Sequence, residues 1–389
     1  MKRKIVFLDA LPFDSAIQVG SQNYARLFRK RGHEVFSLAS YLNMKRFARR
    51  SAEDRELIHN WRHGARVSPE GIHSYTPLCL VPYLRAPFLD HLAVAWNGLR
   101  YCWPDLRTIL EKHGFLEIDL LFVNNIRLIS ILKLIKTKKI LFRISDRIEG
   151  FHNVPRTIGG LQREVIRLAD VNVATSQGLV KEAKRFSPKV FYLPNGVQKD
   201  FIKAGEAPSE YPMEFRSKKK PIVLYVGALN DWFDYDLYEY GLKKVPEASF
   251  VIIGPGHSAI AREKMQRFQK EYPNFSYLGG RLHRELKGYL DHADVGVIPF
   301  LVNDFTNEIN PVKLFEYAAR GLPAVATAMT ELESYRDLVT LCKDKEDYVK
   351  ALRFAAKQKP EISEKLMQKV QDHTWEKRFE SMAHYLEMA

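Results

Sequence analysis

The stretch NEINPVKLFEYAARGLP, residues 307–323, carries the strongest structural signal in the chain. Asn310 and Pro311 are typical of a helix entrance, because an Asn side chain can accept from free backbone amides and proline is tolerated in a first turn. Good helix formers follow, and Gly321 and Pro323 end the pattern. The sequence therefore predicts a short helix whose free N–H groups and partial positive charge suit an anion.

Two charged side chains lie on this predicted helix. Lys313 adds a full positive charge near its start, and Glu316, three residues later, reaches the same face. A cation beside an acceptor-only carboxylate suits a diphosphate next to a ribose, whose hydroxyls need acceptors. The same spacing is typical of an ordinary amphipathic helix with a surface ion pair, which periodicity alone favours. The residues alone leave both interpretations open.

The surrounding sequence resembles a known family. NPVKLFEYAARGLPAVAT is similar to the donor-binding segment of GT-B glycosyltransferases, whose carboxyl-terminal domains carry a glutamate pair with the spacing of Glu308 and Glu316. Further segments follow the order of bacterial group 1 glycosyltransferases and, with it, cover most of residues 221–330: YVGALNDWFD (225–234), FVIIGPG (250–256), YLGGRLHREL (277–286) and ADVGVIPF (293–300). The resemblance implies a nucleoside diphosphate sugar as donor, held by Lys313, Glu308, Glu316 and Asn310.

Apolar runs alternate with helical patterns along the chain, which indicates parallel sheets with helices on both faces. We expect an α/β protein with two doubly wound, Rossmann-like domains (GT-B) facing a central cleft. Residues 1–202 form the acceptor-binding domain, and residues 221–372 form the nucleotide-sugar domain. Residues 203–220 are polar, contain proline and lack periodicity, so they are the expected linker. The resemblance implies that residues 373–389 form a last helix that completes the first domain.

Strands are expected where short apolar runs lie between turn signals. In the first half these runs are 4–9, 33–38, 120–123, 139–144, 171–174 and 189–192. In the second half they are 221–227, 249–254, 275–278, 295–299 and 324–327.

Glycine-containing loops follow several predicted strands. Gly254 and Gly256 let backbone approach a ligand closely, and Gly227 makes a similar loop. A dinucleotide fingerprint would need a third glycine where Ala259 stands, which weakens an NAD-binding interpretation. In the family these loops face the diphosphate and the nucleobase.

The resemblance also places nucleoside contacts at Arg281 and at Phe300, the latter as a stacking surface, although either side chain could be structural. In the first half, Gly20 and Ser21 end a loop, residues 18–21, that precedes a helix at 22–31. We take these two residues as an acceptor-side loop.

Asp234 and Asp236 form an Asp-x-Asp pair, which holds a divalent ion in the other large glycosyltransferase fold. Here they stand at a predicted helix start, where carboxylates cap backbone amides, and we favour capping. No His/Cys cluster has zinc spacing. We expect no metal and no cofactor, with the nucleoside diphosphate sugar as substrate.

A general base is needed if the hydroxyl attacks with inversion. Asp146 follows the predicted strand 139–144, and FRISDRIEGF (142–151) resembles the segment that holds the catalytic aspartate of the xanthan-pathway glucuronosyltransferase, an inverting, membrane-associated GT-B enzyme. That enzyme has glutamine at the position of Glu316 and glutamate at that of Gly280, so its donor and acceptor do not transfer. The alternative for Asp146 is an ion pair with a neighbouring arginine, and Glu149 is the rival base.

Charge is concentrated in the first half: residues 1–200 hold 33 Lys and Arg against 18 Asp and Glu, and the remainder holds 27 against 28. Such a field attracts polyanions. The anionic membrane surface fits best, because basic residues surround Phe47 and an aromatic-rich stretch follows at 75–103. The alternative is a solvated basic face with one long core helix at 88–103. The basic cluster is Lys45, Arg46, Arg49 and Arg50.

The location follows from cysteines and hydropathy. Three scattered cysteines at 79, 102 and 342 argue against a disulfide framework and for a reducing compartment. Asp9 and Pro12 interrupt the only signal-like apolar run, and no run approaches the ~18 apolar residues of a spanning helix. We expect a cytoplasmic protein, peripheral on the inner face of the cell membrane.

Together these patterns predict transfer of a UDP-linked sugar to a hydroxyl of a glycan or a lipid-linked oligosaccharide, in cell-surface polysaccharide synthesis. Inversion is favoured because the loop 227–232 lacks the Arg and Lys that retaining relatives use to hold the diphosphate. The glutamate pair, by contrast, resembles retaining families. A retaining enzyme and a nucleotide-sugar epimerase remain the alternatives within the fold. Outside it stands a basic nucleic-acid-binding protein, for which the chain carries no recognised motif.

Overall fold

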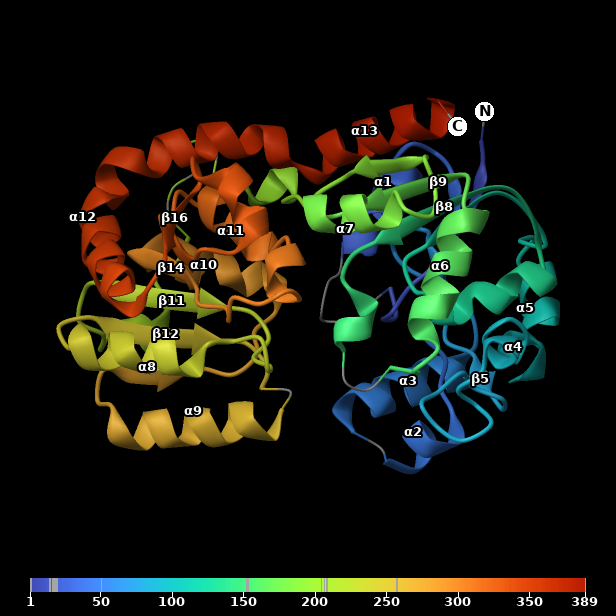
Figure 1. Cartoon of the computed structure of the whole chain (residues 1–389), viewed down its shortest axis with the longest axis horizontal. Coiled ribbons are helices and arrows are strands. Elements are labelled where there is room, and N and C mark those ends of the chain that lie inside the picture. Colours follow the sequence, from blue (N-terminus) through green and yellow to red (C-terminus); the bar gives the residue numbers. More distant parts are fainter. Residues whose placement is uncertain are drawn as a thin grey trace. The chain divides into compact units, whose positions relative to one another are not determined.

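A computed structural model describes residues 2–13, 15, 20–49, 51–151, 154–203, 205, 207, 209–256 and 258–388. The chain forms two compact units, one made of Met1–Pro194 with Phe379–Ala389 and the other of Asn195–Arg378 (Figure 1). Each unit has its own parallel sheet and its own hydrophobic core.

The first unit is built on an eight-stranded sheet with the order β10-β9-β8-β7-β1-β2-β4-β3. Its central strand β1 is buried from Ile5 to Leu8, as expected of a parallel strand covered on both faces. All neighbours pair in parallel except β3 with β4. The strands are β1 (Lys4–Leu8), β2 (Glu34–Leu38), β3 (Arg66–Val67), β4 (His73–Tyr75), β7 (Glu117–Val123), β8 (Lys136–Ile144), β9 (Val171–Ala174) and β10 (Val190–Tyr192).

Helices α1 (Gly20–Lys30), α5 (Leu106–Lys112), α6 (Ile158–Leu168) and α7 (Gln177–Ala183) accompany this sheet. The stretch that offered a long helix at 88–103 instead forms α4 (Leu92–Ala95), a 3-10 turn at Gly98–Tyr101 and strand β6 (Cys102–Trp103), which pairs with β5 (Leu78–Cys79). Among the described residues, none of the helices is both long enough and apolar enough to span a bilayer.

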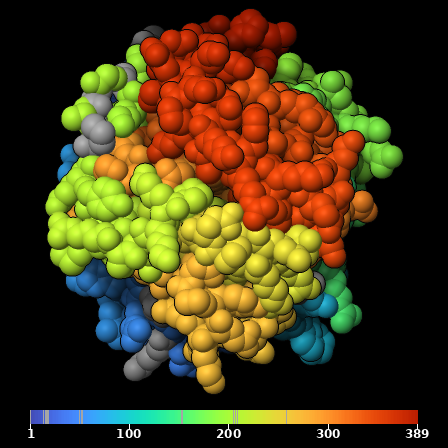
Figure 2. Space-filling view, turned by 90° about the vertical axis from the view of Figure 1, so that its left-hand side faces the viewer, coloured from blue at the N-terminus to red at the C-terminus, as the bar shows by residue number. Residues whose placement is uncertain are grey.

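The second unit has a six-stranded, all-parallel sheet with the order β13-β12-β11-β14-β15-β16. Its strands are β11 (Ile222–Val226), β12 (Ser249–Ile253), β13 (Phe275–Tyr277), β14 (Val295–Ile298), β15 (Ala324–Thr327) and β16 (Val339–Cys342). Its helices are α8 (Tyr235–Lys244), α9 (Ala259–Glu271), α10 (Leu286–His292), α11 (Val312–Ala319) and α12 (Lys345–Lys369). Figure 2 faces the side of this unit on which α12 lies, with α8 and α9 below it.

The boundary between the units differs from the predicted one. The chain enters the second unit at Asn195, before the expected linker at 203–220. The polar composition of that stretch was misleading, because it packs within the second unit: Phe215 is fully buried and the Ser209 amide donates to Asp291 Oδ2 over 2.8 Å.

The last helix, α13 (Trp375–Met388), belongs to the first unit from Phe379 onward. The Phe379 ring meets that of Phe28 on α1 edge to face at 4.6 Å, and the Tyr385 ring stacks on Phe191 at 4.4 Å. Residues 373–378, predicted to complete the first domain, lie in the second unit, where the backbone of Val197 pairs with that of Thr374.

Candidate donor-binding site

Helix α11 presents its amino end without a side-chain cap. The N-cap residue is Pro311, whose side chain cannot form a hydrogen bond with the first amides of the helix. Asn310, predicted to cap the helix, instead forms hydrogen bonds with residues outside it, and its contact with the donor stays a prediction. Its Oδ1 accepts from the Asn195 amide over 3.0 Å, and its Nδ2 donates to Glu331 Oε1 over 3.0 Å. The free amides at the start of α11 remain suited to an anion.

Lys313 lies in the first turn of α11, in an aromatic setting. Its Nζ is 3.3 Å from the Tyr225 hydroxyl and lies 4.6 Å from the ring centroids of both Tyr225 and Phe300. Burial lowers the pKa of Lys313 to about 8, and the nearby Glu316 carboxylate opposes the shift. A cation in this low-dielectric setting gains strongly from an added anion.

Phe300 therefore takes a different place from the one expected. Its side chain is 3% exposed, and its ring lies against the Lys313 ammonium instead of offering a face to a base. The chain reaches this position because β14 ends at Ile298 and its carboxyl end lies beside β11 and β15. We assign Phe300 to the support of Lys313.

Two glycines hold the loops after β11 and β12 in contact. Gly227 has φ +140° and Gly254 has φ +153°, a region that side chains disfavour. A Cβ on Gly254 would stand 1.9 Å from the Gly227 carbonyl oxygen, and one on Gly227 would stand 2.9 Å from Lys313 Nζ. Gly256 pairs through its backbone with Leu229. These loops therefore bring backbone directly beside Lys313.

Glu316 lies on α11 one turn after Lys313, as the helical spacing predicted. Its Oε1 is 2.8 Å from Nε2 of His283, a residue that sequence reasoning did not single out although it falls in YLGGRLHREL. No local signal connects two residues 33 positions apart. Glu308 lies in a 3-10 turn, Thr306–Glu308, before the helix and is buried.

Arg281 is committed to structural contacts. Its Nη2 pairs with Glu214 Oε1 at 2.9 Å, and its Nη1 donates to the Leu278 carbonyl over 2.7 Å. The guanidinium thereby joins residues 213–215 to the loop after β13, and its contact with the nucleoside stays a prediction. Sequence spacing could not show the partner 67 residues away.

Asp234 caps α8, which is the role that the sequence favoured over metal binding. Its Oδ1 accepts from the Leu237 amide over 2.8 Å. Asp236 points elsewhere and pairs with Lys264 at 3.3 Å. The Asp-x-Asp pair is thus divided between a cap and a surface ion pair.

In the first unit, Asp146 follows the carboxyl end of β8. Burial raises its pKa, and the Arg143 guanidinium opposes the shift. Arg143 itself donates to Asn124 Oδ1 over 2.9 Å. The rival base Glu149 is exposed and lies 3.7 Å from Arg163.

A second carboxylate was missed in the same unit. Asp9 follows β1, is fully buried and accepts from the Ser37 hydroxyl over 3.0 Å. Burial raises its pKa to about 6, against the opposing effects of Ser21, Ser37 and Arg143. The sequence showed Asp9 only as an interruption of an apolar run.

Gly20 and Ser21 are helical, since α1 begins at Gly20, two residues earlier than expected. Ser21 is fully buried, so these residues do not form the predicted acceptor-side loop. The rest of that loop, Gln18 and Val19, lies outside the described residues.

The basic cluster is also partly structural. Arg46 and Arg49, on helix α2 (Met44–Arg49), pair with the buried Asp54 at 2.7 and 2.8 Å, and Phe47 packs edge to face on Trp61. Asp54 lies on α3 (Ala52–His63), and Arg50 lies outside the described residues. These two arginines hold α2 on α3, so the cluster is not simply a solvated basic face.

Comparison with known proteins agrees with this architecture. Residues 220–358 match the family model described as glycosyl transferases group 1. A Bacillus subtilis (strain 168) protein named as a teichuronic acid biosynthesis glycosyltransferase, TuaH, is 26% identical over 180 residues, 44% of this chain and 44% of that protein. The match thus spans less than half of that relative's length.

Solved structures match the whole chain. Anabaena Alr3699/HepE in complex with UDP and glucose has a TM-score of 0.66 at 13% identity, with 100% of both chains covered. The lipopolysaccharide outer core galactosyltransferase WaaB has a TM-score of 0.57 at 14% identity, with 99% of both chains covered. At these identities the likeness concerns the fold. The chain therefore has the GT-B fold of glycosyltransferases and carries a group 1 glycosyltransferase domain at residues 220–358.

Proposed function

We propose that this protein is a glycosyltransferase that moves a sugar from a UDP-linked donor to a hydroxyl of a glycan or a lipid-linked oligosaccharide, in cell-surface polysaccharide synthesis. The observation that carries the proposal is the uncapped start of α11 with Lys313 and Glu316 on one face, inside the group 1 domain. The names of the relatives support it: HepE is described with UDP-glucose and TuaH with teichuronic acid biosynthesis.

In the proposed donor complex, the diphosphate lies at the amino end of α11. The free amides of the first turn and the Lys313 ammonium neutralise its charge, so that no metal ion is needed. Gly227 and Gly254 let the neighbouring backbone approach the phosphates closely. Glu316 accepts from the ribose hydroxyls.

We propose inversion for the transfer step. Asp146 takes the proton of the acceptor hydroxyl while the oxygen of that hydroxyl bonds to the anomeric carbon of the donor sugar. The bond from the anomeric carbon to the diphosphate breaks, and its electron pair leaves with UDP. The loop 227–232 contains no Arg or Lys, which supports inversion. The pair Glu308 and Glu316 favours the second candidate, a retaining transferase.

A panel of nucleotide sugars tests the donor. We expect a UDP-sugar to raise the melting temperature, because ligand bound to the native state stabilises it by RT ln(1 + [L]/Kd). The anomeric configuration of the product, read by the proton coupling of its anomeric signal, then separates inversion from retention. Stabilisation by no nucleotide sugar in the panel would contradict the proposed function, and retained configuration would favour the second candidate.

We also propose that the first unit binds an anionic membrane surface. Four large apolar side chains between residues 80 and 103 are at least half exposed: Leu80, Phe88, Tyr101 and Trp103. The chain is basic overall, with a net charge of +14, and the excess lies in residues 1–200. Apolar anchors beside positive charge suit the boundary between headgroups and acyl chains.

Replacing Leu80 and Phe88 together by Asp should lower binding to phosphatidylglycerol-containing vesicles by at least about tenfold, because each anchor loses burial worth roughly 1.5–3 kcal/mol and gains a charge. Cosedimentation with vesicles measures the effect. Phe354→Asp is the matched control, since Phe354 is 62% exposed in the second unit, and it should bind like the wild type. Equal losses in both variants would contradict this surface.

A further inference from the structure

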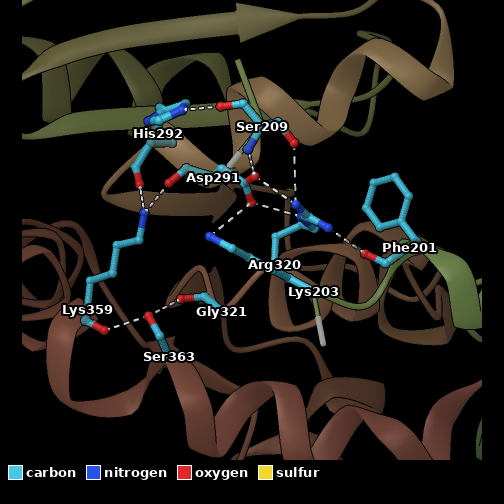
Figure 3. Close-up of polar contacts among 10 residues, drawn as sticks. Phe201, Lys203, Ser209, Asp291, His292, Arg320, Gly321, Lys359 and Ser363 are labelled. Atoms are coloured by element: carbon cyan, nitrogen blue, oxygen red, sulfur yellow. Dashed lines mark hydrogen bonds and ion pairs between the residues drawn. The ribbon is translucent and has the colours of Figure 1, made fainter. Parts of the chain in front are cut away.

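A fully buried ion pair lies at the end of α11. Arg320, which follows the last helical residue, places Nε 2.8 Å from Asp291 Oδ1 and Nη2 2.7 Å from Asp291 Oδ2, and both side chains are 0% exposed (Figure 3). Such a bidentate pair fixes geometry as well as charge. Removing one partner would leave an uncompensated buried charge, so the two side chains are held tightly to each other.

The pair also fixes the segment that enters the second unit. Arg320 Nη1 donates to the Phe201 carbonyl over 3.1 Å, and Asp291 Oδ2 accepts from the Ser209 amide over 2.8 Å (Figure 3). The Lys203 amide donates to the carbonyl of Ala319, the last residue of α11, over 2.9 Å. Phe201 is therefore tied by its backbone to the carboxyl end of the helix that carries Glu316.

A histidine connects the side chain of Phe201 to Glu316. The Phe201 ring is 2% exposed and lies 4.8 Å from the His283 ring, and His283 Nε2 is 2.8 Å from Glu316 Oε1. Glu316 stands one helical turn before Arg320. The contacts thus form a closed path from Glu316 through His283 and Phe201 to Arg320, which directly follows the helix that carries Glu316.

These contacts restrain one oxygen of the Glu316 carboxylate. Oε1 is held by the imidazole, while Oε2 of Glu316 has no hydrogen-bond partner among the described residues. A carboxylate held at one oxygen has lost most of its rotational freedom before a ligand arrives, and the other oxygen keeps its lone pairs for new donors.

We propose that His283 is the positioning residue for Glu316, and that Phe201, held by the Arg320–Asp291 pair, keeps the imidazole in place. The carboxylate is then preset to accept from a ribose diol. This inference rests on the proposed function in one respect, the arrival of a nucleoside diphosphate at α11. It adds His283, and the contacts that hold its imidazole in place, to the residues that touch the donor.

The test compares two nucleotides on the full chain by titration calorimetry: UDP, and a UDP whose ribose lacks both hydroxyls. His283→Phe keeps a ring against Phe201 but removes the N–H donor. We expect the Kd of UDP to rise about tenfold and that of the dideoxy analogue to change less than about twofold, since a charge-assisted hydrogen bond is lost only where Glu316 is used. His283→Gln, which can still donate to Glu316, should restore most of the affinity.

His292→Phe is the matched control, because His292 is the last residue of α10, the helix that follows the 3-10 turn His283–Glu285, and its Nε2 contacts the Ser209 carbonyl of the same segment instead of Glu316. It should leave both constants unchanged. Equal rises for the two nucleotides in His283→Phe, or no rise in either, would overturn the positioning role. Wild-type protein that binds both nucleotides equally would also overturn it, whereas wild-type protein that binds neither would refute the proposed function itself.

Discussion

Replacing Asp146 by Asn should lower the rate of sugar transfer by about a thousandfold while leaving the Kd of UDP within about twofold of the wild type. Asparagine keeps the size of the side chain but cannot take the proton of the acceptor hydroxyl. Burial raises the pKa of Asp146, which makes its ionised form a stronger base than an exposed aspartate. The ionised form is needed, so the wild-type rate should rise as pH increases through that raised pKa. Initial-rate measurements against pH and calorimetry with UDP check both parts.

Two further carboxylates serve as comparisons for Asp146. Glu149→Gln removes an exposed side chain paired with Arg163 and should keep nearly wild-type turnover. Asp9→Asn changes the buried carboxylate after β1, whose pKa is raised to about 6. Substantial turnover in Asp146→Asn would contradict its role, and a loss confined to Asp9→Asn or Glu149→Gln would identify that residue as the base.

Lys313→Ala should weaken UDP binding by about thirtyfold and uridine binding by less than about twofold, because a charge-assisted contact to phosphate is lost while no contact to the nucleoside changes. Calorimetric titration with both ligands gives the comparison. Lys264→Ala, which removes a lysine that pairs with Asp236 on the surface, is the control and should leave both affinities unchanged. Similar losses for UDP and uridine would remove Lys313 from the diphosphate.

The wild-type pH profile offers an independent check on Lys313. Burial lowers its pKa to about 8 in the free protein, so the ammonium is present below that pH and neutral amine predominates above it. A diphosphate binds the charged form better, so UDP affinity should fall as pH rises through about 8. This decline should be absent in Lys313→Ala. A flat wild-type profile between pH 7 and about 9 would contradict the low pKa.

The central strands of both sheets were predictable to within a few residues at each end, because strands buried on both faces read as continuous apolar runs. The predicted strand 249–254 is observed as β12 and 171–174 as β9. Shorter strands were missed. β4 is only three residues long, His73–Tyr75, and β16 has an exposed and a half-buried residue between its two buried ends, so neither gives such a run.

Within the candidate site, the sequence predicted what depends on local spacing. Lys313 and Glu316 share a face because they are three residues apart on one helix. The side-chain partners of Asn310 and Arg281, which are Glu331 and Glu214, could not be predicted because they are distant in sequence. His283 escaped notice for the same reason. Side-chain partners across the fold decide such roles, and no periodicity encodes them.

The contact between Gly227 and Gly254 has a consequence for attempts to change which sugar nucleotide the protein accepts. With a Cβ on Gly254 only 1.9 Å from the Gly227 carbonyl oxygen, neither loop can gain a side chain there without moving the other. A randomised library that includes both positions would lose most of its members to misfolding. Donor preference is better varied at positions outside this backbone crossing.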